Sequence, residues 1–182
     1  MQRVFDLLFS ASGLLFGFPV LLVVYVIGWF DTKSPLFLQQ RVGKGMKPFV
    51  LVKFRTMSVG TASVASHLAS SASVTKVGSF LRRTKLDELP QLWNVLKGEM
   101  SLVGPRPNLF NQEDLIAERS ERGVYDVRPG ITGLAQIQNI DMSTPKLLAE
   151  IDKLMIDSLS IKSYFTYIFK TIAGSGGGDA LK

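Results

Sequence analysis

Two adjacent carboxylates, Asp87 and Glu88, stand among cationic side chains in the run RRTKLDELPQLWNVLKGEMSLVGPRP, residues 82–107. A carboxylate can act as a nucleophile, as a proton carrier or as an oxygen ligand of a hard divalent metal. A phosphate at the same place would be repelled unless cations stood between the anions. Guanidinium groups such as those of Arg82 and Arg106, together with a metal, are candidates for that role.

A helix is expected to begin at this carboxylate pair. Apolar residues recur there at helical spacing: Leu86, Leu89, Leu92, Trp93 and Leu96. Pro90 is tolerated only in a first turn, so Asp87 is predicted to be the N-cap of a helix that runs to about Lys97 and stops at Gly98. Such an N-cap is held ionised by orphan N–H groups, and the same helix end attracts phosphate. An isolated Asp-Glu pair is more often an ordinary acidic first turn.

Basic and amide side chains elsewhere could contact the same phosphate. Lys53 and Arg55 end a predicted strand and, two residues apart, are expected on one face of it. Their alternative role is to protect a solvated sheet edge. Arg106 lies between two prolines, and Arg128 precedes a proline and a glycine, so each is either a rigidly positioned guanidinium or part of a structural turn. Gln136, with a second glutamine two residues later, could read a base or a sugar, or could be a surface residue.

The N-terminal part of the chain predicts a membrane anchor. Residues 7–30 contain no charge, and a helix of that length reaches across a hydrocarbon core of about 30 Å at about 1.5 Å per residue. The run is too long for a cleaved signal peptide and has no evident cleavage site. Pro19, near its middle, would kink a helix, which spanning helices also tolerate. The excess of Lys and Arg in residues 31–55 places that flank in the cytoplasm.

The remaining elements are expected to be short. Residues 36–40 and 49–54 flank a Gly-Lys-Gly turn and predict a β-hairpin. Residues 58–75 are rich in serine and predict a loop. Residues 111–121 predict a solvated amphipathic helix. The segment from Thr144 has helical periodicity and an aromatic-rich end, which suits a helix at the lipid headgroups or one packed on the domain.

Composition bounds the class of protein. A chain of 182 residues predicts one domain with a modest core. Because it has no cysteine, a disulfide framework and a cysteine metal site are excluded. The single histidine, His67, is interpreted as a loop residue. Lys and Arg number 21 against 15 Asp and Glu, which predicts anionic partners: nucleic acid, acidic lipid headgroups or phosphorylated small molecules.

Three motifs in register carry a resemblance to a known family. They are KFRTM at 53–57, LRRTKLDELPQLWNVLKGEMSLVGPRP at 81–107 and VRPGITGLAQ at 127–136. With them the chain resembles the bacterial sugar transferases, the monotopic phosphoglycosyl transferases that start glycoconjugate assembly on a polyprenol carrier.

This resemblance implies an α/β (α+β) fold that is mostly helical. A re-entrant helix-break-helix would occupy residues 1–32, and a small cytosolic catalytic domain with a β-hairpin and interfacial amphipathic helices would occupy 33–172. A flexible tail would follow at 173–182. Pro19 falls where the break would be, although the family usually has Ser-Pro where this chain has Phe18-Pro19.

The function that the resemblance implies is transfer of a sugar-1-phosphate from a UDP-sugar to undecaprenyl phosphate, with release of UMP. Asp87 would be the nucleophile that forms an aspartyl-phosphosugar, and Glu88 would help it to hold Mg²⁺ or would manage a proton. Phosphate and substrate contacts would come from Lys53, Arg55, Arg82, Arg106, Arg128 and Gln136. The expected location is the cytoplasmic face of the bacterial inner membrane, with membrane lipids and not nucleic acid as further partners. The sugar and the oligomeric state are not implied.

Two other functions stay open. A membrane-attached glycosyltransferase would move the sugar without its phosphate and release UDP, although its usual acidic metal-binding motif is not visible in the sequence. A basic, non-enzymatic membrane adaptor or nucleic-acid binder would bind with a steep salt dependence and would be indifferent to Asp87→Asn.

Overall fold

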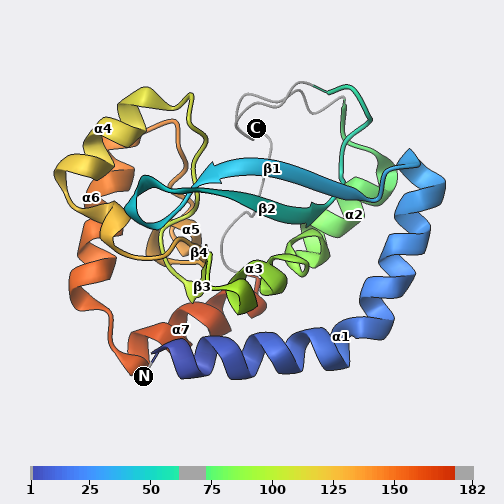
Figure 1. Ribbon diagram of the computed structural model, residues 1–182, viewed down its shortest axis with the longest axis horizontal. Coiled ribbons are helices and arrows are strands. Elements are labelled where there is room, and N and C mark those ends of the chain that lie inside the picture. Colours follow the sequence, from blue (N-terminus) through green and yellow to red (C-terminus); the bar gives the residue numbers. More distant parts are fainter. Residues whose placement is uncertain (1, 62–72, 175–182) are drawn as a thin grey trace.

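The computed structural model describes residues 2–61 and 73–174, and this part of the chain is mostly helical, as predicted (Figure 1). The helices are α1 (Gln2–Thr32), α2 (Lys76–Thr84), α3 (Gln91–Lys97), α4 (Glu113–Glu121), α5 (Leu134–Ile137), α6 (Pro145–Ser158) and α7 (Ile161–Ile172). The strands are β1 (Leu36–Val42), β2 (Pro48–Phe54), β3 (Ser101–Val103) and β4 (Gly130–Thr132). Short 3-10 turns are η1 (Lys44–Met46), η4 (Leu86–Glu88) and η5 (Val124–Asp126). His67, most of the serine-rich segment and nearly all of the predicted tail lie outside the described residues.

Helix α1 contains Pro19 without an interruption of the helix. The predicted break is therefore a bend, and Figure 1 shows α1 with two arms at a sharp angle to each other. Pro19 accounts for such a bend because its ring clashes with the carbonyl four residues earlier and it has no N–H to donate. By length and composition α1 could cross a membrane.

The first arm of α1 is attached to the domain by polar side chains. Asp6 is buried, and its Oδ1 accepts hydrogen bonds from Ser101 Oγ (3.0 Å), the amide of Leu102 (3.0 Å) and Tyr164 Oη (2.7 Å). Arg3 donates to the carbonyl of Leu96 at 3.2 Å. The start of α1 is thus fixed to β3, α3 and α7.

The second arm returns to the same domain through apolar contacts. Val24 is buried in a cluster with Phe54 of β2 and Leu81 of α2. Near the end of α1, Gly28 lies so close to Pro35 that an added Cβ would meet the proline Cβ at 3.1 Å. Both ends of α1 therefore contact one and the same domain.

Strands β1 and β2 form the predicted antiparallel hairpin, in which Lys53 pairs with Phe37. Asn94 of α3 closes the outer edge of β2, because its Oδ1 accepts from the amide of Val52 (3.1 Å) and its Nδ2 donates to the carbonyl of Val50 (2.7 Å). Asn94 is completely buried. These bonds lock α3, and with it the preceding turn η4, against the strand that carries Lys53.

Strands β3 and β4 form a short parallel pair that was not predicted, with Ser101 opposite Gly130 and Val103 opposite Thr132. This pairing brings the backbone of the Gly-Pro-Arg-Pro loop (residues 104–107) next to that of the Arg-Pro-Gly segment (residues 128–130). A Cβ added at Gly130 would lie 2.0 Å from the amide nitrogen of Gly104. Only glycine allows this close approach of two chains.

Helix α7 packs on the domain, which is one of the two alternatives predicted for the C-terminal aromatic segment; a position at the lipid headgroups stays a prediction. Tyr164 and Tyr167 are buried against the domain, whereas Phe169 and Ile172 are 66% and 77% exposed. A side-chain capping box at Ser160 begins the helix. One face of α7 is therefore core, and the other is an exposed apolar surface.

Candidate active site

The carboxylate pair lies in a tight turn between two helices. Helix α2 ends because Lys85 adopts the left-handed conformation, with φ of 58°, and the 3-10 turn η4 follows. Asp87 is inside this turn. The prediction that Asp87 is the N-cap of α3 was therefore wrong. Pro90 has no N–H to continue the turn, so it becomes the N-cap and α3 begins at Gln91. The helix-dipole argument for Asp87 therefore does not apply.

Glu88 is the centre of a buried group of charges. Its Oε1 lies 3.2 Å from Lys53 Nζ of β2 and 3.5 Å from Arg106 Nη2 of the Gly-Pro-Arg-Pro loop. Lys53 and Glu88 are only 7% and 9% exposed, and Asp87 only 3%. Charges buried to this degree persist only when they are paired. The structure thus brings together three of the predicted site residues, Lys53, Glu88 and Arg106, and Asp87 is the neighbour of Glu88 in the same turn.

Arg82 and Arg55 hold the ends of secondary-structure elements. Arg82 Nε donates to Thr56 Oγ1 at 2.9 Å, which joins α2 to the KFRTM motif. Arg55 Nε donates to the carbonyl of Ser34 at 2.8 Å, and its Nη2 to that of Leu36 at 3.2 Å. Arg55 lies one residue beyond the end of β2, where strand alternation no longer places it beside Lys53. These bonds direct its guanidinium toward the start of β1.

Arg128 and Gln136 also lie apart from the Glu88 contacts. Arg128 Nε donates to the carbonyl of Gly98 at 2.8 Å, at the C-terminal end of α3, where a cation is favourable. Arg128 lines a cavity of about 600 Å³ together with Arg3 and Asp6, and Glu88 does not line this cavity. Gln136 Nε2 donates to Ile131 at 3.4 Å, and its buried Oε1 has no hydrogen-bond partner among the described residues. The substrate roles predicted for these two residues stay predictions.

A largely apolar cavity of about 560 Å³ opens beside Glu88. Its apolar lining comes from η4, α3, β3 and α7 and includes Leu86, Leu89, Leu92, Leu102, Ile168 and Ile172. Lys85 also lines it and donates from Nζ to the carbonyl of Thr171 at 3.0 Å. Burial lowers the pKa of Lys85, and the nearby carboxylate of Glu88 opposes that shift. The cavity suits an apolar ligand with an anionic head.

The carboxylates of Asp87 and Glu88 are too few to coordinate Mg²⁺ by themselves and would need further oxygen ligands from a bound substrate. In residues 2–61 and 73–174 no group of three or more His, Cys, Asp or Glu side chains could hold a metal ion. Mg²⁺ is commonly bound by one or two carboxylates together with substrate phosphates and water. Asp87 and Glu88 supply two carboxylates of this kind, and the Mg²⁺ role predicted for them stays a prediction.

Sequence reasoning missed a buried polar group behind the site. Arg119 was assigned to a solvated helix, yet it is 1% exposed and pairs with Asp152. One signal was available, because Leu115 and Arg119 are four residues apart and hence on one face of α4. Leu115 is also 1% exposed.

A model of a protein family described as bacterial sugar transferase matches residues 1–175. The chain belongs to the bacterial sugar transferase family. The predicted resemblance is thereby confirmed, and the names of several relatives agree with the predicted enzyme class, a phosphoglycosyl transferase.

The sugar transferase chain is similar to relatives from several bacteria. It is 37% identical over 188 residues to an exopolysaccharide production protein of Rhizobium leguminosarum, covering 94% of this chain and 93% of that protein. It is 36% identical over 170 residues to a UDP-glucose:undecaprenyl-phosphate glucose-1-phosphate transferase of Caulobacter vibrioides, covering 87% and 64%. Against an uncharacterized sugar transferase of Haemophilus influenzae, 33% identical over 192 residues, it covers 94% of itself but only 40% of the relative.

Proposed function

We propose that this sugar transferase moves a sugar-1-phosphate from a UDP-sugar to undecaprenyl phosphate and releases UMP. One observation carries the proposal: a buried Asp-Glu turn lies beside two cations and next to a largely apolar cavity. The cations suit a diphosphate, and the cavity suits a lipid phosphate. The name of the Caulobacter vibrioides relative states this reaction class for that protein.

The reaction has two displacements at one phosphorus atom. In the first, a carboxylate oxygen of Asp87 bonds to the β-phosphorus while the bond to the oxygen that bridges the α- and β-phosphorus atoms breaks, so UMP leaves. In the second, a phosphate oxygen of undecaprenyl phosphate bonds to the same phosphorus and the bond to Asp87 breaks. The product is the lipid diphosphate sugar, and Asp87 is again a free carboxylate.

Lys53 and Arg106 neutralise negative charge on the transferring phosphoryl group, and burial strengthens their effect. Glu88 contacts both cations and so fixes their positions. Asp87 and Glu88 are the residues that would hold Mg²⁺. When bound, the ion would neutralise charge on the diphosphate. The chain itself then supplies the nucleophile, the cations and the exclusion of water.

We propose further that α1 is re-entrant and keeps the domain on the cytoplasmic face of the bacterial inner membrane. Arg3 and Asp6 at its start and Val24 and Gly28 in its second arm contact the same domain. A helix with both ends on one domain cannot place them on opposite sides of a bilayer. Between them, Leu15 and Phe16 are 71% and 80% exposed, as expected of residues that enter lipid.

The topology can be tested with single cysteines, because the chain has none of its own. We expect cysteine at Gln2 and cysteine at Lys153 to react with a membrane-impermeant maleimide in inverted vesicles and not in spheroplasts. As a control, cysteine at Phe16 should react only after detergent is added. Labelling of the Gln2 variant in spheroplasts together with labelling of the Lys153 variant in inverted vesicles would instead establish a spanning helix.

The reaction is tested by the nucleotide released from a panel of UDP-sugars with Mg²⁺ and undecaprenyl phosphate. We expect UMP from at least one sugar and loss of its release when EDTA removes the metal, with recovery on adding excess Mg²⁺. Release of UDP would identify a glycosyltransferase and contradict the proposal. Absence of any nucleotide from every UDP-sugar would also contradict it.

A further inference from the structure

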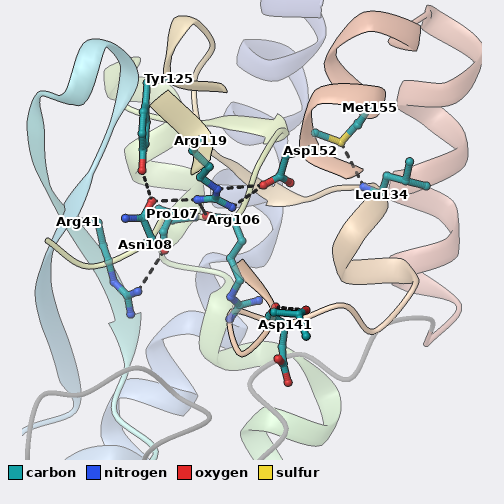
Figure 2. Close-up of polar contacts among 11 residues, drawn as sticks. Arg41, Arg106, Pro107, Asn108, Arg119, Tyr125, Leu134, Asp141, Asp152 and Met155 are labelled. Carbon is teal, nitrogen blue, oxygen red and sulfur yellow. Dashed lines mark hydrogen bonds and ion pairs between the residues drawn. The ribbon is translucent and has the colours of Figure 1, made fainter. Parts of the chain in front are cut away.

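Four consecutive backbone carbonyls, those of residues 105–108, accept hydrogen bonds from β4, α4 and β1, and Figure 2 shows the two that come from Arg119 and Arg41. The carbonyl of Pro105 accepts from the amide of Gly130 (2.8 Å), and that of Arg106 accepts from Arg119 Nη1 (2.8 Å). The carbonyl of Pro107 accepts from Arg41 Nη1 (3.1 Å), and that of Asn108 accepts from the amide of Val42 (3.0 Å). Pro105 and Pro107 have no N–H and a fixed φ. The loop that carries Arg106 is therefore held mainly through its carbonyls.

Among these donors, Arg119 is a buried charged side chain with only 1% of its surface exposed. Its Nε and Nη2 donate to Asp152 Oδ2 of α6 at 3.0 and 2.6 Å. Its Nη1 donates to the carbonyl of Arg106 and also to Asn108 Oδ1, at 2.9 Å. Tyr125 Oη donates to the same Asn108 oxygen at 3.0 Å. One planar guanidinium thus joins α4 and α6 to the loop, as Figure 2 shows.

Stability alone does not account for this buried pair. Removing two charges from water costs several kcal/mol per ion, and apolar pairs of similar size are often as stable. Asp152 Oδ1 is buried and finds no hydrogen-bond partner in the described part of the chain, and burial raises the pKa of Asp152. An apolar pair would have no N–H to donate to the carbonyl of Arg106, whereas Arg119 donates that hydrogen bond.

We propose that Arg119, oriented by Asp152, is a positioning residue that fixes the backbone of Arg106 and so directs the Arg106 guanidinium to Glu88 and to the phosphate of the substrate. This inference rests on the proposed function. The distance between Arg106 Nη2 and Glu88 Oε1 is 3.5 Å, so a small shift of the loop removes the contact. Misplacement of a catalytic group by about 1 Å can cost about 10²-fold in rate.

The test replaces the ion pair by an apolar pair, Arg119→Met with Asp152→Leu, in the full-length protein. The double variant buries no charge at these two positions, so we expect it to fold, whereas either single variant would leave an unpaired buried charge there. Arg122→Met is the matched control: Arg122 is the C-cap residue of α4 and contacts Glu150 of α6 at 3.8 Å, but its hydrogen bond and ion pairs are to Glu118, Glu121 and Glu150. We expect kcat of the double variant to fall about 10- to 100-fold with KM within about threefold, and the control to retain both values.

A second comparison distinguishes positioning from a general loss of stability. Arg106→Ala should lower kcat in the wild-type background, and adding it to the double variant should lower kcat little further, because both changes remove the same contact. If the losses from Arg106→Ala and from the apolar pair multiply, Arg119 does not act through Arg106 and the proposal is overturned. A folded double variant with wild-type kcat would overturn it as well.

Hydrogen exchange gives a readout that does not depend on the reaction. We expect the peptide containing residues 104–109 to exchange faster in the double variant than in the wild type or the Arg122→Met control, with exchange in α1 unchanged. Unchanged exchange at 104–109 would overturn the positioning role. If the wild-type protein released no UMP, the proposed function would fail, and the exchange measurement would still decide whether Arg119 and Asp152 fix this loop.

Discussion

Replacing Asp87 by asparagine is expected to reduce turnover by about 10⁴-fold or more, the scale seen when a covalent nucleophile is removed. Asparagine has nearly the same shape, but its neutral amide is no nucleophile toward phosphorus. Because Asp87 is 3% exposed and lies in a short turn, a substitution of the same size should leave the packing intact. UMP release and thermal unfolding of the purified variant measure the two expectations.

The covalent step gives a sharper test of the same residue. Wild-type protein incubated with the UDP-sugar alone, without lipid acceptor, should carry a phosphosugar on the peptide that contains Asp87, and the Asn variant should carry none. Asp157→Asn is a suitable control, because Asp157 is an exposed carboxylate on α6 whose ion-pair partner is Lys153. An active Asp87→Asn protein, or an adduct on another residue, would refute the nucleophile assignment.

The next largest effect is expected for Glu88→Gln, which should lower kcat about 10²- to 10³-fold, the range for loss of one acid-base or electrostatic group. The change removes the carboxylate charge that lies 3.2 Å from Lys53 and 3.5 Å from Arg106. Lys53 and Arg106 then lose the carboxylate that contacts both of them, so their positions should change. Glu118→Gln is the control, since Glu118 also pairs with an arginine, at 2.6 Å, but on the surface of α4.

The same variant separates the two roles considered for Glu88. A metal ligand predicts that Glu88→Gln needs more Mg²⁺ for half-maximal activity, with the pH dependence of kcat/KM unchanged. A proton carrier predicts loss of one limb of that pH dependence at an unchanged Mg²⁺ requirement. A Glu88→Gln protein with the wild-type rate would exclude both roles.

Features with local causes were predictable from the sequence. The hairpin follows from two apolar strands around a Gly-Lys-Gly turn, and the end of α3 at Gly98 follows from its left-handed conformation, with φ of 85°. The start of that helix was placed wrongly, because the left-handed Lys85 ends α2 and starts a separate 3-10 turn. Lysine in the left-handed conformation is uncommon, and no local sequence pattern predicted it at Lys85.

Features that depend on distant segments were not predictable. The pairing of β3 with β4 requires close contact between the backbones at Gly104 and Gly130. A glycine in the sequence does not indicate which distant segment its backbone will contact. The contact of Lys53 with Glu88 follows from the bonds of Asn94 to β2, which polarity patterns do not reveal. Arg55 was expected beside Lys53 by strand alternation, a rule that ends with the strand at Phe54.

The attachment of α1 at both ends has a consequence for protein engineering. Its first arm satisfies polar groups on β3 and α7, and its second arm covers Phe54 and Leu81. Deleting the helix, or exchanging it for a straight transmembrane segment from another protein, would uncover part of the hydrophobic core. Helix α1 is thus a part of the domain's fold, and a version of this enzyme without α1 would need its α1-binding surface redesigned together with the truncation.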